Sequence, residues 1–449
     1  MGKLFGTDGI RGVANEYPLT SEIAVNIGRA VASILGTDSQ RPKIILGKDT
    51  RLSGDMLEYA LASGICSAGG EPYLAGTIPT PGVAYLTSSM DASAGIVISA
   101  SHNPFYDNGI KIFNGDGYKL TDEKEAEIER FVLDKNSETL CGSVKETGCV
   151  HTLDDASESY TKFLKCFLPD KSLFNGMRLV LDCANGATYR VAPQLFSDLG
   201  AEVEFIFKAP DGKNINAGCG SEHPEVLIKK VIENKADVGL AFDGDGDRLI
   251  AVDEVGQIIT GDRVLAIFAK FYKKKGLLKN NLVISTVMSN IGLGIALNNM
   301  GIDHMMTQVG DRYVLQQMIA SGAVIGGEDS GHLIFADYHT TGDGILTALR
   351  LLQAMQAESE PLSKLSKIMT VFPQVLINVE VKHKPNIESV PEIINAIRTV
   401  ETSLGEEGRV LIRYSGTQPL CRVMVEGPSQ EETQKHCQQI ADFVQASLA

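Results

Sequence analysis

Three aspartates alternate with glycines in the segment DGDGDR, at Asp243, Asp245 and Asp247. This spacing places three carboxylates on one side of a turn, and the glycines let the backbone fold around a small cation. Hard oxygen ligands of this kind suit Mg²⁺. A lone acidic turn is usually a solvated surface feature, but this one directly follows the apolar run VGLAF. The pattern therefore predicts a site for one divalent metal ion.

An EF-hand calcium loop is the rival interpretation of the same aspartates. Position twelve of such a loop, counted from Asp243, falls on Glu254, where a bidentate ligand would be expected. However, the sixth position, which needs glycine, is Arg248, and the flanking runs VGLAF and LIAVD are typical of strands rather than helices. We reject the calcium-sensor interpretation on these two grounds.

A serine in a polar loop is the second candidate for chemistry. Ser101 lies in ISASHNPFYDNGIKIF, after a buried-strand pattern. By itself this loop is explained as well by an Asn-Pro turn as by a catalytic role. A hydrolase triad is disfavoured, because the GxSxG elbow is absent and an adjacent His102 is not expected to reach the hydroxyl of its neighbour. A divalent metal brought to Ser101 would instead suit phosphoryl transfer, which depends on positioning and charge neutralisation.

Two further loops carry groups that suit a sugar phosphate. GGEDSGH offers polar side chains for sugar hydroxyls, at Glu328, Ser330 and His332. RYSGTQP offers a guanidinium, two hydroxyls and backbone N–H groups for a phosphate dianion, at Arg413, Ser415, Gly416 and Thr417. Positive charge also comes from Arg11 in FGTDGIRG and from Lys111 after the serine loop. The competing interpretations are an acidic turn for GGEDSGH, an ordinary surface turn for RYSGTQP, and solvated surface positions for the two basic residues.

The elements that must position these loops repeat three times. Each copy has a β-branched run, a polar turn and an apolar-periodic helix, beginning in 44–54, 179–188 and 282–292. The three helices are expected to end at glycines, at Gly69-Gly70, Gly200 and Gly301. A second buried strand follows in each copy, at 94–99, 237–242 and 323–327, and leads into a reactive loop. Because ligands gather at the carboxyl ends of strands in open α/β sheets, the three loops are expected to converge on one cleft.

The segment from residue 368 breaks this pattern and predicts a small α+β domain that could cover the cleft. Its strands are expected at 374–381, 409–413 and 422–426, and its helices at 391–404 and from Gln430. The predicted fold is α/β, with three repeated mixed α/β/α sandwich domains around a central cleft plus a C-terminal α+β domain. The expected domains are 1–150 with the serine loop, 151–254 with the metal loop, 255–367 with the sugar-binding loop, and 368–449 with the phosphate-binding loop.

Composition narrows the class of protein. The chain has 449 residues, of which 43% are hydrophobic and 22% charged, as in globular proteins with a real core. A net charge of −15 argues against nucleic-acid binding. The eight cysteines form no CxxC pair and predict free thiols in a reducing compartment. With no signal-like start and no apolar run of bilayer length, the sequence predicts a cytoplasmic protein that is not in a membrane.

These loops together resemble those of the α-D-phosphohexomutases, and within that family the bacterial enzymes that act on glucosamine phosphates. The resemblance runs nearly from end to end, in the order GTDGIRG, ISASHNPFYDNGIK, GLAFDGDGDR, SNIGLG, VGDRYV, GGEDSGH, TTGDG and RYSGTQP. It implies interconversion of glucosamine 6-phosphate and glucosamine 1-phosphate through a sugar 1,6-bisphosphate, which feeds UDP-N-acetylglucosamine and cell-wall precursor synthesis. The four-domain architecture of the family agrees with the layout expected from the repeat.

The resemblance also implies roles for individual residues. Ser101 would be the phosphoryl carrier and, as a dianionic phosphoserine, a fourth ligand of Mg²⁺ beside the three aspartates. The other residues implied in catalysis are Arg11 and Arg248 as contacts of the phosphoserine, Lys111 as the proton acceptor, and His102 next to the carrier. Glu328, Ser330 and His332 would bind the sugar, and Arg413, Ser415, Gly416 and Thr417 the distal phosphate.

Three positions depart from the family pattern: Gln418 where Glu is usual, Tyr414 where Lys is frequent, and Asp329 at a variable place. They leave the choice among glucosamine, glucose and mannose phosphates open. The alternatives are a phosphoglucomutase or phosphomannomutase of the same family, a metal-dependent sugar-phosphate phosphatase, and a non-catalytic protein that binds a sugar phosphate or a metal. Whether the chain forms a homodimer is also left open.

Overall fold

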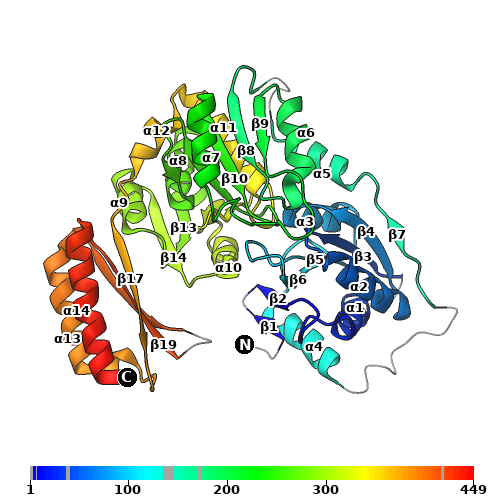
Figure 1. Ribbon diagram of the computed structural model, residues 1–449, viewed down its shortest axis with the longest axis horizontal. Helices are drawn as coiled ribbons and strands as arrows, with labels where there is room; N and C mark the ends of the chain where they lie inside the picture. The colour runs from blue at the N-terminus through cyan, green and yellow to red at the C-terminus, as the bar shows by residue number, and fades with distance from the viewer. Residues whose placement is uncertain (1–3, 7, 37–40, 135–145, 169–172, 416–418) are drawn as a thin grey trace. The chain divides into compact units, whose positions relative to one another are not determined.

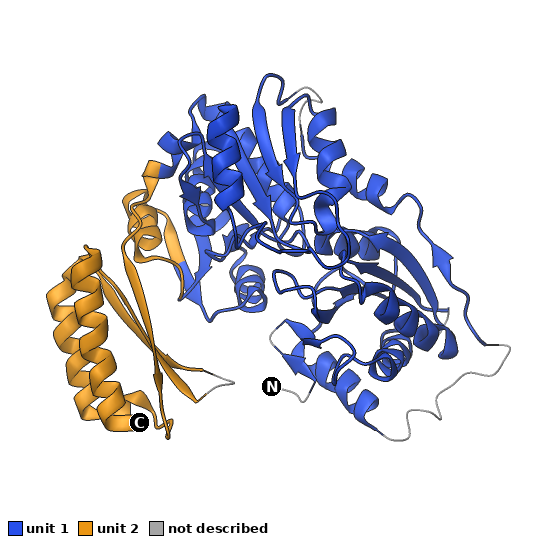
Figure 2. Ribbon diagram, in the orientation of Figure 1, with its two compact units in different colours: residues 1–287, 305–366 blue, residues 288–304, 367–449 orange. Residues whose placement is uncertain are grey.

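The computed structural model of the chain describes residues 4–6, 8–36, 41–134, 146–168, 173–415 and 419–449. Two compact units are present, one of residues 1–287 and 305–366 and the other of residues 288–304 and 367–449 (Figure 2). The first unit contains the serine, aspartate and GGEDSGH loops, and the second contains the described part of the RYSGTQP loop.

The N-terminal sheet of the first unit has seven strands in the order β1-β2-β6-β5-β3-β4-β7 (Figure 1). Its strands are β1 (Phe5–Gly6), β2 (Gly9–Val13), β3 (Lys43–Lys48), β4 (Glu71–Thr77), β5 (Ala94–Ile98), β6 (Asp107–Asn114) and β7 (His151–Thr152). Its helices are α1 (Ser21–Leu35), α2 (Gly54–Ser67), α3 (Thr80–Ser89) and α4 (Asp122–Leu133). Alternate side chains of β3 and β5 pack against α1 and α2, and the opposite face packs against Val83 of α3. The sheet is therefore covered by helices on both faces.

The second sheet has the order β12-β11-β10-β8-β9. Its strands are β8 (Arg178–Asp182), β9 (Glu202–Ile206), β10 (Val238–Phe242), β11 (Leu249–Asp253) and β12 (Ile258–Ile259). The helices of this part of the chain are α5 (Ala156–Lys165), the short 3₁₀ helix η2 (Ala187–Tyr189), α6 (Val191–Asp198) and α7 (Glu225–Asn234). Residues of β10 are entirely buried, which explains why the run VGLAF is apolar without alternation.

The third sheet has four strands in the order β14-β13-β15-β16. Its strands are β13 (Leu282–Thr286), β14 (Asp303–Thr307), β15 (Ile325–Gly327) and β16 (Leu333–Phe335). The helices here are α8 (Gly261–Lys275), α9 (Ile291–Asn299), α10 (Asp311–Ser321), α11 (Gly344–Glu358) and α12 (Leu362–Leu365), followed by the 3₁₀ turn η4 (Ser366–Ile368). Most of α11 is buried, as its run of apolar side chains predicts.

The same strand pattern recurs in all three sheets. The strands that lead into the reactive loops, β5, β10 and β15, each pair in parallel with the first strand of their copy, and each pairs antiparallel with the strand that follows. The helices α2, α6 and α9 are followed by left-handed glycines, with φ of 85° at Gly69, 87° at Gly200 and 61° at Gly301. The predicted fold class is confirmed.

The second unit has a three-stranded antiparallel sheet in the order β17-β19-β18. Its elements are β17 (Gln374–Glu380), the 3₁₀ turn η5 (Ile387–Ser389), α13 (Pro391–Leu404), β18 (Arg409–Tyr414), β19 (Leu420–Glu426) and α14 (Gln430–Leu448). Helix α9 belongs to this unit, because the Ile291 N–H donates to Glu426 Oε2 at 2.9 Å and Asn290 Nδ2 donates to the Phe372 carbonyl at 2.9 Å. The sequence pattern of the repeat had grouped this helix with the third sheet instead.

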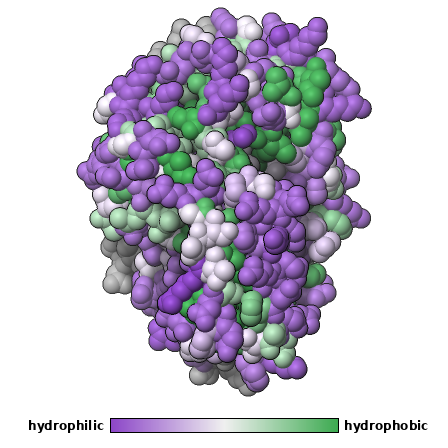
Figure 3. Space-filling model, turned by 90° about the vertical axis from the view of Figure 1, so that its left-hand side faces the viewer, coloured by the Kyte–Doolittle hydropathy of each residue, from purple (hydrophilic) through white to green (hydrophobic). Residues whose placement is uncertain are grey.

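The surface of the molecule, its helices and its cysteines were compared with the expectations from composition. One face of the molecule is mostly hydrophilic, with hydrophobic side chains in smaller groups between (Figure 3). No helix in the described ranges is both long enough and apolar enough to cross a membrane. The seven cysteines that the structure describes are free thiols, and Cys141 lies outside the described residues.

A buried hydrogen bond joins α5 to the start of α11. The Tyr160 hydroxyl donates to Asp343 Oδ2 at 2.7 Å, while Asp343 Oδ1 caps α11 by accepting from the Leu346 N–H at 2.9 Å. Burial raises the pKa of Asp343 to about 6, although these hydrogen bonds favour its charged form. The charged carboxylate therefore destabilises the folded protein above that pH, and the hydrogen bond from Tyr160 reduces this cost.

We expect Tyr160→Phe to lower the free energy of unfolding by about 1–3 kcal/mol at pH 8, because a buried carboxylate oxygen loses its donor. The substitution raises the folded-state pKa of Asp343 further. Since a raised carboxyl pKa means that stability is lost as pH rises towards it, the difference from the wild type should shrink at pH 5, where the carboxyl is largely neutral in both proteins. Urea denaturation at the two pH values measures this. Tyr59→Phe, at an exposed tyrosine of α2, is the control, and an equal loss at both pH values would contradict the prediction.

Candidate active site

The serine and aspartate loops meet at a buried hydrogen bond. Ser101 follows β5 and is only 1% exposed, and its Oγ donates to Asp243 Oδ2 at 2.6 Å. The two residues are 142 positions apart in the chain. The repeat predicts this convergence, because β5 and β10 are corresponding strands whose carboxyl ends carry the two loops.

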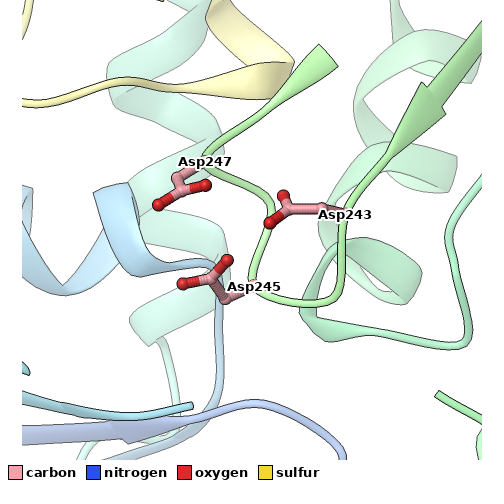
Figure 4. Close-up of side chains that lie close together, drawn as sticks. All are labelled: Asp243, Asp245 and Asp247. Atoms are coloured by element: carbon pink, nitrogen blue, oxygen red, sulfur yellow. The ribbon is translucent and has the colours of Figure 1, made fainter. Parts of the chain in front are cut away.

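The three aspartate carboxylates lie in the loop between β10 and β11 and point towards one another (Figure 4). All three are buried, and each offers a ligand atom within 4.8 Å of the others. Thr80 Oγ1, at the start of α3, donates to Asp245 Oδ2 at 2.6 Å. Within the described residues, Asp245 Oδ1 and Asp247 Oδ1 are buried without a hydrogen-bond partner. Orphaned hard oxygens in a buried cluster fit a divalent cation.

The electrostatics of the aspartates also fit a cation. Burial raises the pKa of Asp243 well above its usual value, and the charges of Asp247 and Asp245 raise it further. For Asp245, burial acts in the same direction, but the Lys111 ammonium and hydrogen bonds to the carboxylate bring its pKa below the usual value. Three like charges this close repel one another, and a bound divalent cation would relieve the repulsion.

Lys111 on β6 lies in the middle of this cluster. Its Nζ is 2.9 Å from Asp245 Oδ2, 3.3 Å from Asp247 Oδ2 and 3.2 Å from Asp8 Oδ2. Burial lowers the pKa of Lys111, but these carboxylates more than offset burial and hold it well above its usual value. An ammonium has no lone pair to accept a proton. Its role as proton acceptor thus stays a prediction, which requires another cation to take over the carboxylates.

His102 lies closer to Ser101 than the sequence led us to expect. Its Nδ1 is 3.3 Å from Ser101 Oγ, so the expectation that an adjacent histidine could not reach the hydroxyl is wrong. The reason is the left-handed backbone of Ser101, with φ of 53°, which places the two side chains within reach of each other. Burial and the nearby Arg248 guanidinium lower the pKa of His102, which favours a neutral ring.

Two guanidiniums flank the serine loop. Arg11 donates to the Ala100 carbonyl at 3.4 Å and to Asp8 Oδ2 at 2.5 Å, and Arg248 follows the last aspartate. The Nε atoms of Arg11 and Arg248 are both buried and, among the described residues, have no hydrogen-bond partner. Unused N–H donors of two guanidiniums that line the same cavity as His102 suit the oxygens of a phosphoryl group.

A cavity of about 500 Å³ opens beside these groups. The predicted site residues that line it are Arg11, His102, Asp247, Arg248, Glu328 and His332. Glu328 Oε1 accepts from the Gly310 N–H at 3.0 Å. His332 is 3% exposed, and in the described structure neither ring nitrogen has a hydrogen-bond partner, nor does the buried Ser330 Oγ. The third loop thus places Glu328 and the His332 ring at this cavity, whereas Ser330 is not among the residues that line it.

The predicted distal phosphate loop lies in the second unit. Arg413 is at the end of β18, where it pairs directly with Arg422 of β19, and burial and this neighbour lower its pKa. Lys384 Nζ donates to the Ser415 carbonyl at 2.6 Å. Gly416 and Thr417 lie outside the described residues. Two guanidiniums opposite each other are unfavourable without an anion, so the described part of this loop fits phosphate binding.

Several residues that hold the site together were not predicted from the sequence. Lys119 Nζ lies 2.5 Å from Asp8 Oδ1 and also donates to Asp311 at the start of α10, which links the first and third sheets. Asp8 and Asp311 stand inside the motifs FGTDGIRG and VGDRYV, which could have signalled them. Thr80 stands in no such motif, and only the fold brings it to Asp245.

The fold and this site define a class of enzyme. A buried serine hydroxyl bonded to a metal-type carboxylate cluster, with unused guanidinium donors beside a polar cavity, is typical of metal-assisted phosphoryl transfer to and from a small anionic substrate.

The sequence matches the phosphoglucomutase/phosphomannomutase family in all four of its domains. Alpha/beta/alpha domain I matches residues 2–139, domain II residues 158–256, domain III residues 260–372, and the C-terminal domain residues 376–443. The chain belongs to this family, which confirms the resemblance seen in the sequence.

Individual relatives agree with this result. The chain is 61% identical to the phosphoglucosamine mutase of Syntrophus aciditrophicus over 448 residues and 57% identical to that of Syntrophobacter fumaroxidans, covering 100% of both proteins in each case. A phosphoglucomutase/phosphomannomutase family protein from Burkholderia thailandensis has a similar structure, with a TM-score of 0.81 at 26% identity over 99% of this chain and 97% of that one. N-acetylphosphoglucosamine mutase from Aspergillus fumigatus, solved with GlcNAc-6P and magnesium, shares the fold at a TM-score of 0.71 and 15% identity, over 99% and 96% of the two chains.

Proposed function

We propose that this enzyme interconverts glucosamine 6-phosphate and glucosamine 1-phosphate. The observation that carries the chemistry is the 2.6 Å hydrogen bond from Ser101 Oγ to Asp243, in a buried site that fits a divalent cation. The choice of sugar is supported by identities of 50–61% to several phosphoglucosamine mutases over nearly their whole length. The product would feed UDP-N-acetylglucosamine and cell-wall precursor synthesis.

Ser101 would carry the phosphoryl group in two half-reactions. In the first, a sugar hydroxyl oxygen forms a bond to the phosphorus of phosphoserine, the bond from phosphorus to Ser101 Oγ breaks, and the hydroxyl proton ends on Oγ. The product is a glucosamine 1,6-bisphosphate. In the second, Oγ forms a bond to the other phosphorus and its proton passes to the departing sugar oxygen. The carrier is regenerated, so the same bisphosphate can also activate an unphosphorylated enzyme.

The residues around Ser101 would stabilise the negative charge of the phosphoryl group and transfer the proton. Asp243, Asp245, Asp247 and a phosphoserine oxygen would hold one Mg²⁺, which supplies positive charge next to the transferred group. Arg11 and Arg248 would direct their unused N–H groups at the same oxygens. His102, which is 3.3 Å from Oγ, would contact the serine oxygen, and Lys111 would accept the proton of the attacking hydroxyl and pass it on to Oγ.

The remaining site residues would bind the substrate. Glu328, Ser330 and His332 would bind the sugar hydroxyls, and Arg413, Ser415, Gly416 and Thr417 the phosphate that is not being transferred. In this proposal the chain has four domains, at 1–150, 151–254, 255–367 and 368–449, and each contributes one of the reactive loops. A cytoplasmic location is part of this proposal and is supported by the substrate class and by the free thiols of the described cysteines. Solution scattering would test whether the enzyme is a homodimer.

The direct test is competition among glucosamine, glucose and mannose 6-phosphates, followed by phosphorus NMR with Mg²⁺ and a trace of sugar 1,6-bisphosphate. We expect the highest kcat/KM for glucosamine 6-phosphate and a visible 1-phosphate product. A preference for glucose or mannose phosphate would assign a different mutase of the same family. Inorganic phosphate as the main product would instead mean a phosphatase.

A further inference from the structure

Two side chains, from loops that follow strands of different sheets, donate hydrogen bonds to the same two carbonyl groups of the serine loop. Arg51, which follows β3, donates from Nη2 to the carbonyls of Ser101 at 2.9 Å and Asn103 at 2.8 Å. Asn216, from the loop after β9, donates from Nδ2 to the same carbonyls at 2.9 Å and 3.0 Å. Both side chains are buried. We call these four hydrogen bonds the carbonyl clamp.

The serine loop needs such a clamp because its backbone is strained. Ser101 has φ of 53°, a left-handed conformation that is costly for a residue with a Cβ atom. A strained conformation persists only where its surroundings over-determine it. The Ser101 N–H is also held, by the Ser99 hydroxyl at 2.9 Å. The clamp holds the other end of the residue and so aims Oγ at Asp243.

Asn216 is itself held by the loop after β8, which in turn contacts the residues that follow β3 of the first sheet. Its backbone N–H donates to the Ala184 carbonyl at 3.0 Å, in the loop where the Asn185 carbonyl accepts from Thr50 Oγ1. Next to Arg51, the Leu52 N–H donates to the Gly212 carbonyl at 2.9 Å. The loop that carries Asn216 is therefore tied to the loop that carries Arg51.

The aspartate loop, through Gly244, also packs against the Ser101 carbonyl. A Cβ atom on Gly244 would lie 2.5 Å from the Ser101 carbonyl oxygen and 2.8 Å from Asn216 Nδ2. Only glycine fits there, so the aspartate loop packs directly on the clamp. A small rotation of the Ser101 carbonyl would thus change the distance between Oγ and the aspartates.

We propose that Asn216 is a positioning residue for phosphoryl transfer at Ser101, and that it acts through the Ser101 carbonyl together with Arg51. The inference rests on the proposed function of Ser101 as the carrier. Asn216 is not among the residues that line the cavity of about 500 Å³, and its side-chain amide donates to carbonyls of the serine loop. Its loss should therefore slow transfer to and from Ser101 and leave sugar binding intact.

The test compares Asn216→Ala with the wild type in full-length, Mg²⁺-loaded enzyme. We expect kcat to fall by about 10- to 100-fold, the effect of a small misplacement of a reacting group, with KM for glucosamine 6-phosphate within about two-fold of the wild type. Asn216→Asp keeps the size but points an acceptor at two carbonyls, so kcat should fall further than in Asn216→Ala. Lys213→Ala, at an exposed residue of the same loop, is the control and should match the wild type.

A second readout separates this inference from the choice of substrate. The rate at which Ser101 gains a phosphoryl group from glucose 1,6-bisphosphate, followed by intact mass, should fall by the same factor in both variants. If the wild type is phosphorylated but forms no glucosamine 1-phosphate, the proposed substrate is wrong and the phosphorylation rates still test the clamp. An unchanged phosphorylation rate in Asn216→Ala, or an equal rise in KM, would overturn the inference. Should Asn216→Ala not fold, the same comparison is made with Asn216→Asp.

Discussion

Replacing Ser101 with alanine is expected to reduce formation of glucosamine 1-phosphate by at least about a thousand-fold, because the carrier oxygen is lost and no step can bypass it. The substitution removes one hydroxyl donor to Asp243 and adds no bulk in a buried loop. The folded structure should therefore survive. The variant should also gain no mass on exposure to glucose 1,6-bisphosphate, whereas the wild type should gain one phosphoryl group.

Ser93→Ala is the matched control for this experiment. Ser93 directly precedes β5, at the opposite end of the strand from Ser101, and its substitution should leave both conversion and the mass gain unchanged. Conversion is followed by phosphorus NMR and the covalent state by intact mass. Retention of even a tenth of the activity in Ser101→Ala would exclude this serine as the carrier.

Replacing Asp243 with asparagine should have opposite effects on activity and on the stability of the metal-free protein. Activity should fall by about a hundred-fold or more, because one of the charged ligands next to the transferred group is lost. In EDTA, however, the free energy of unfolding should rise by about 1 kcal/mol, because the substitution removes a buried carboxyl group whose pKa is raised by burial and by the like charges of Asp247 and Asp245. The amide keeps an acceptor for the Arg248 N–H, which donates to Asp243 Oδ1 at 3.1 Å.

Thermal unfolding with EDTA and with Mg²⁺ tests both parts of this prediction. Wild-type Tm should rise on adding Mg²⁺, since an ion that binds only the folded state stabilises it. The Tm of Asp243→Asn should start higher in EDTA and rise less. Asp154→Asn, at an exposed aspartate, should behave as the wild type in both conditions. A lower Tm for Asp243→Asn in EDTA would mean that the carboxylates do not repel one another in the folded protein.

Local patterns in the sequence were enough to predict the fold class and the main loops. Buried parallel strands need continuous apolar runs, and helix ends at Gly69, Gly200 and Gly301 need a residue that tolerates positive φ, so both leave a signature in short segments. The repeat then placed Ser101 and Asp243 at corresponding strand ends, where the structure finds them in hydrogen-bond contact.

Other features depend on contacts that no local pattern encodes. The protonated state of Lys111 comes from carboxylates of Asp8, Asp245 and Asp247, which lie more than a hundred positions away in the chain. The reach of His102 depends on the φ of its neighbour, which the surrounding loops impose. The packing of α9 with the second unit depends on Glu426, whose carboxylate caps a helix far earlier in the sequence.

The sequence by itself thus determined which polar residues follow the repeated strands, because their types and spacing belong to the turns at the strand ends, and it predicted that they carry the chemistry. Tertiary structure alone decided how these residues are held and charged. A buried charge or a strained backbone is tolerated only where partners from distant segments meet it, as Arg51 and Asn216 meet the carbonyl of Ser101.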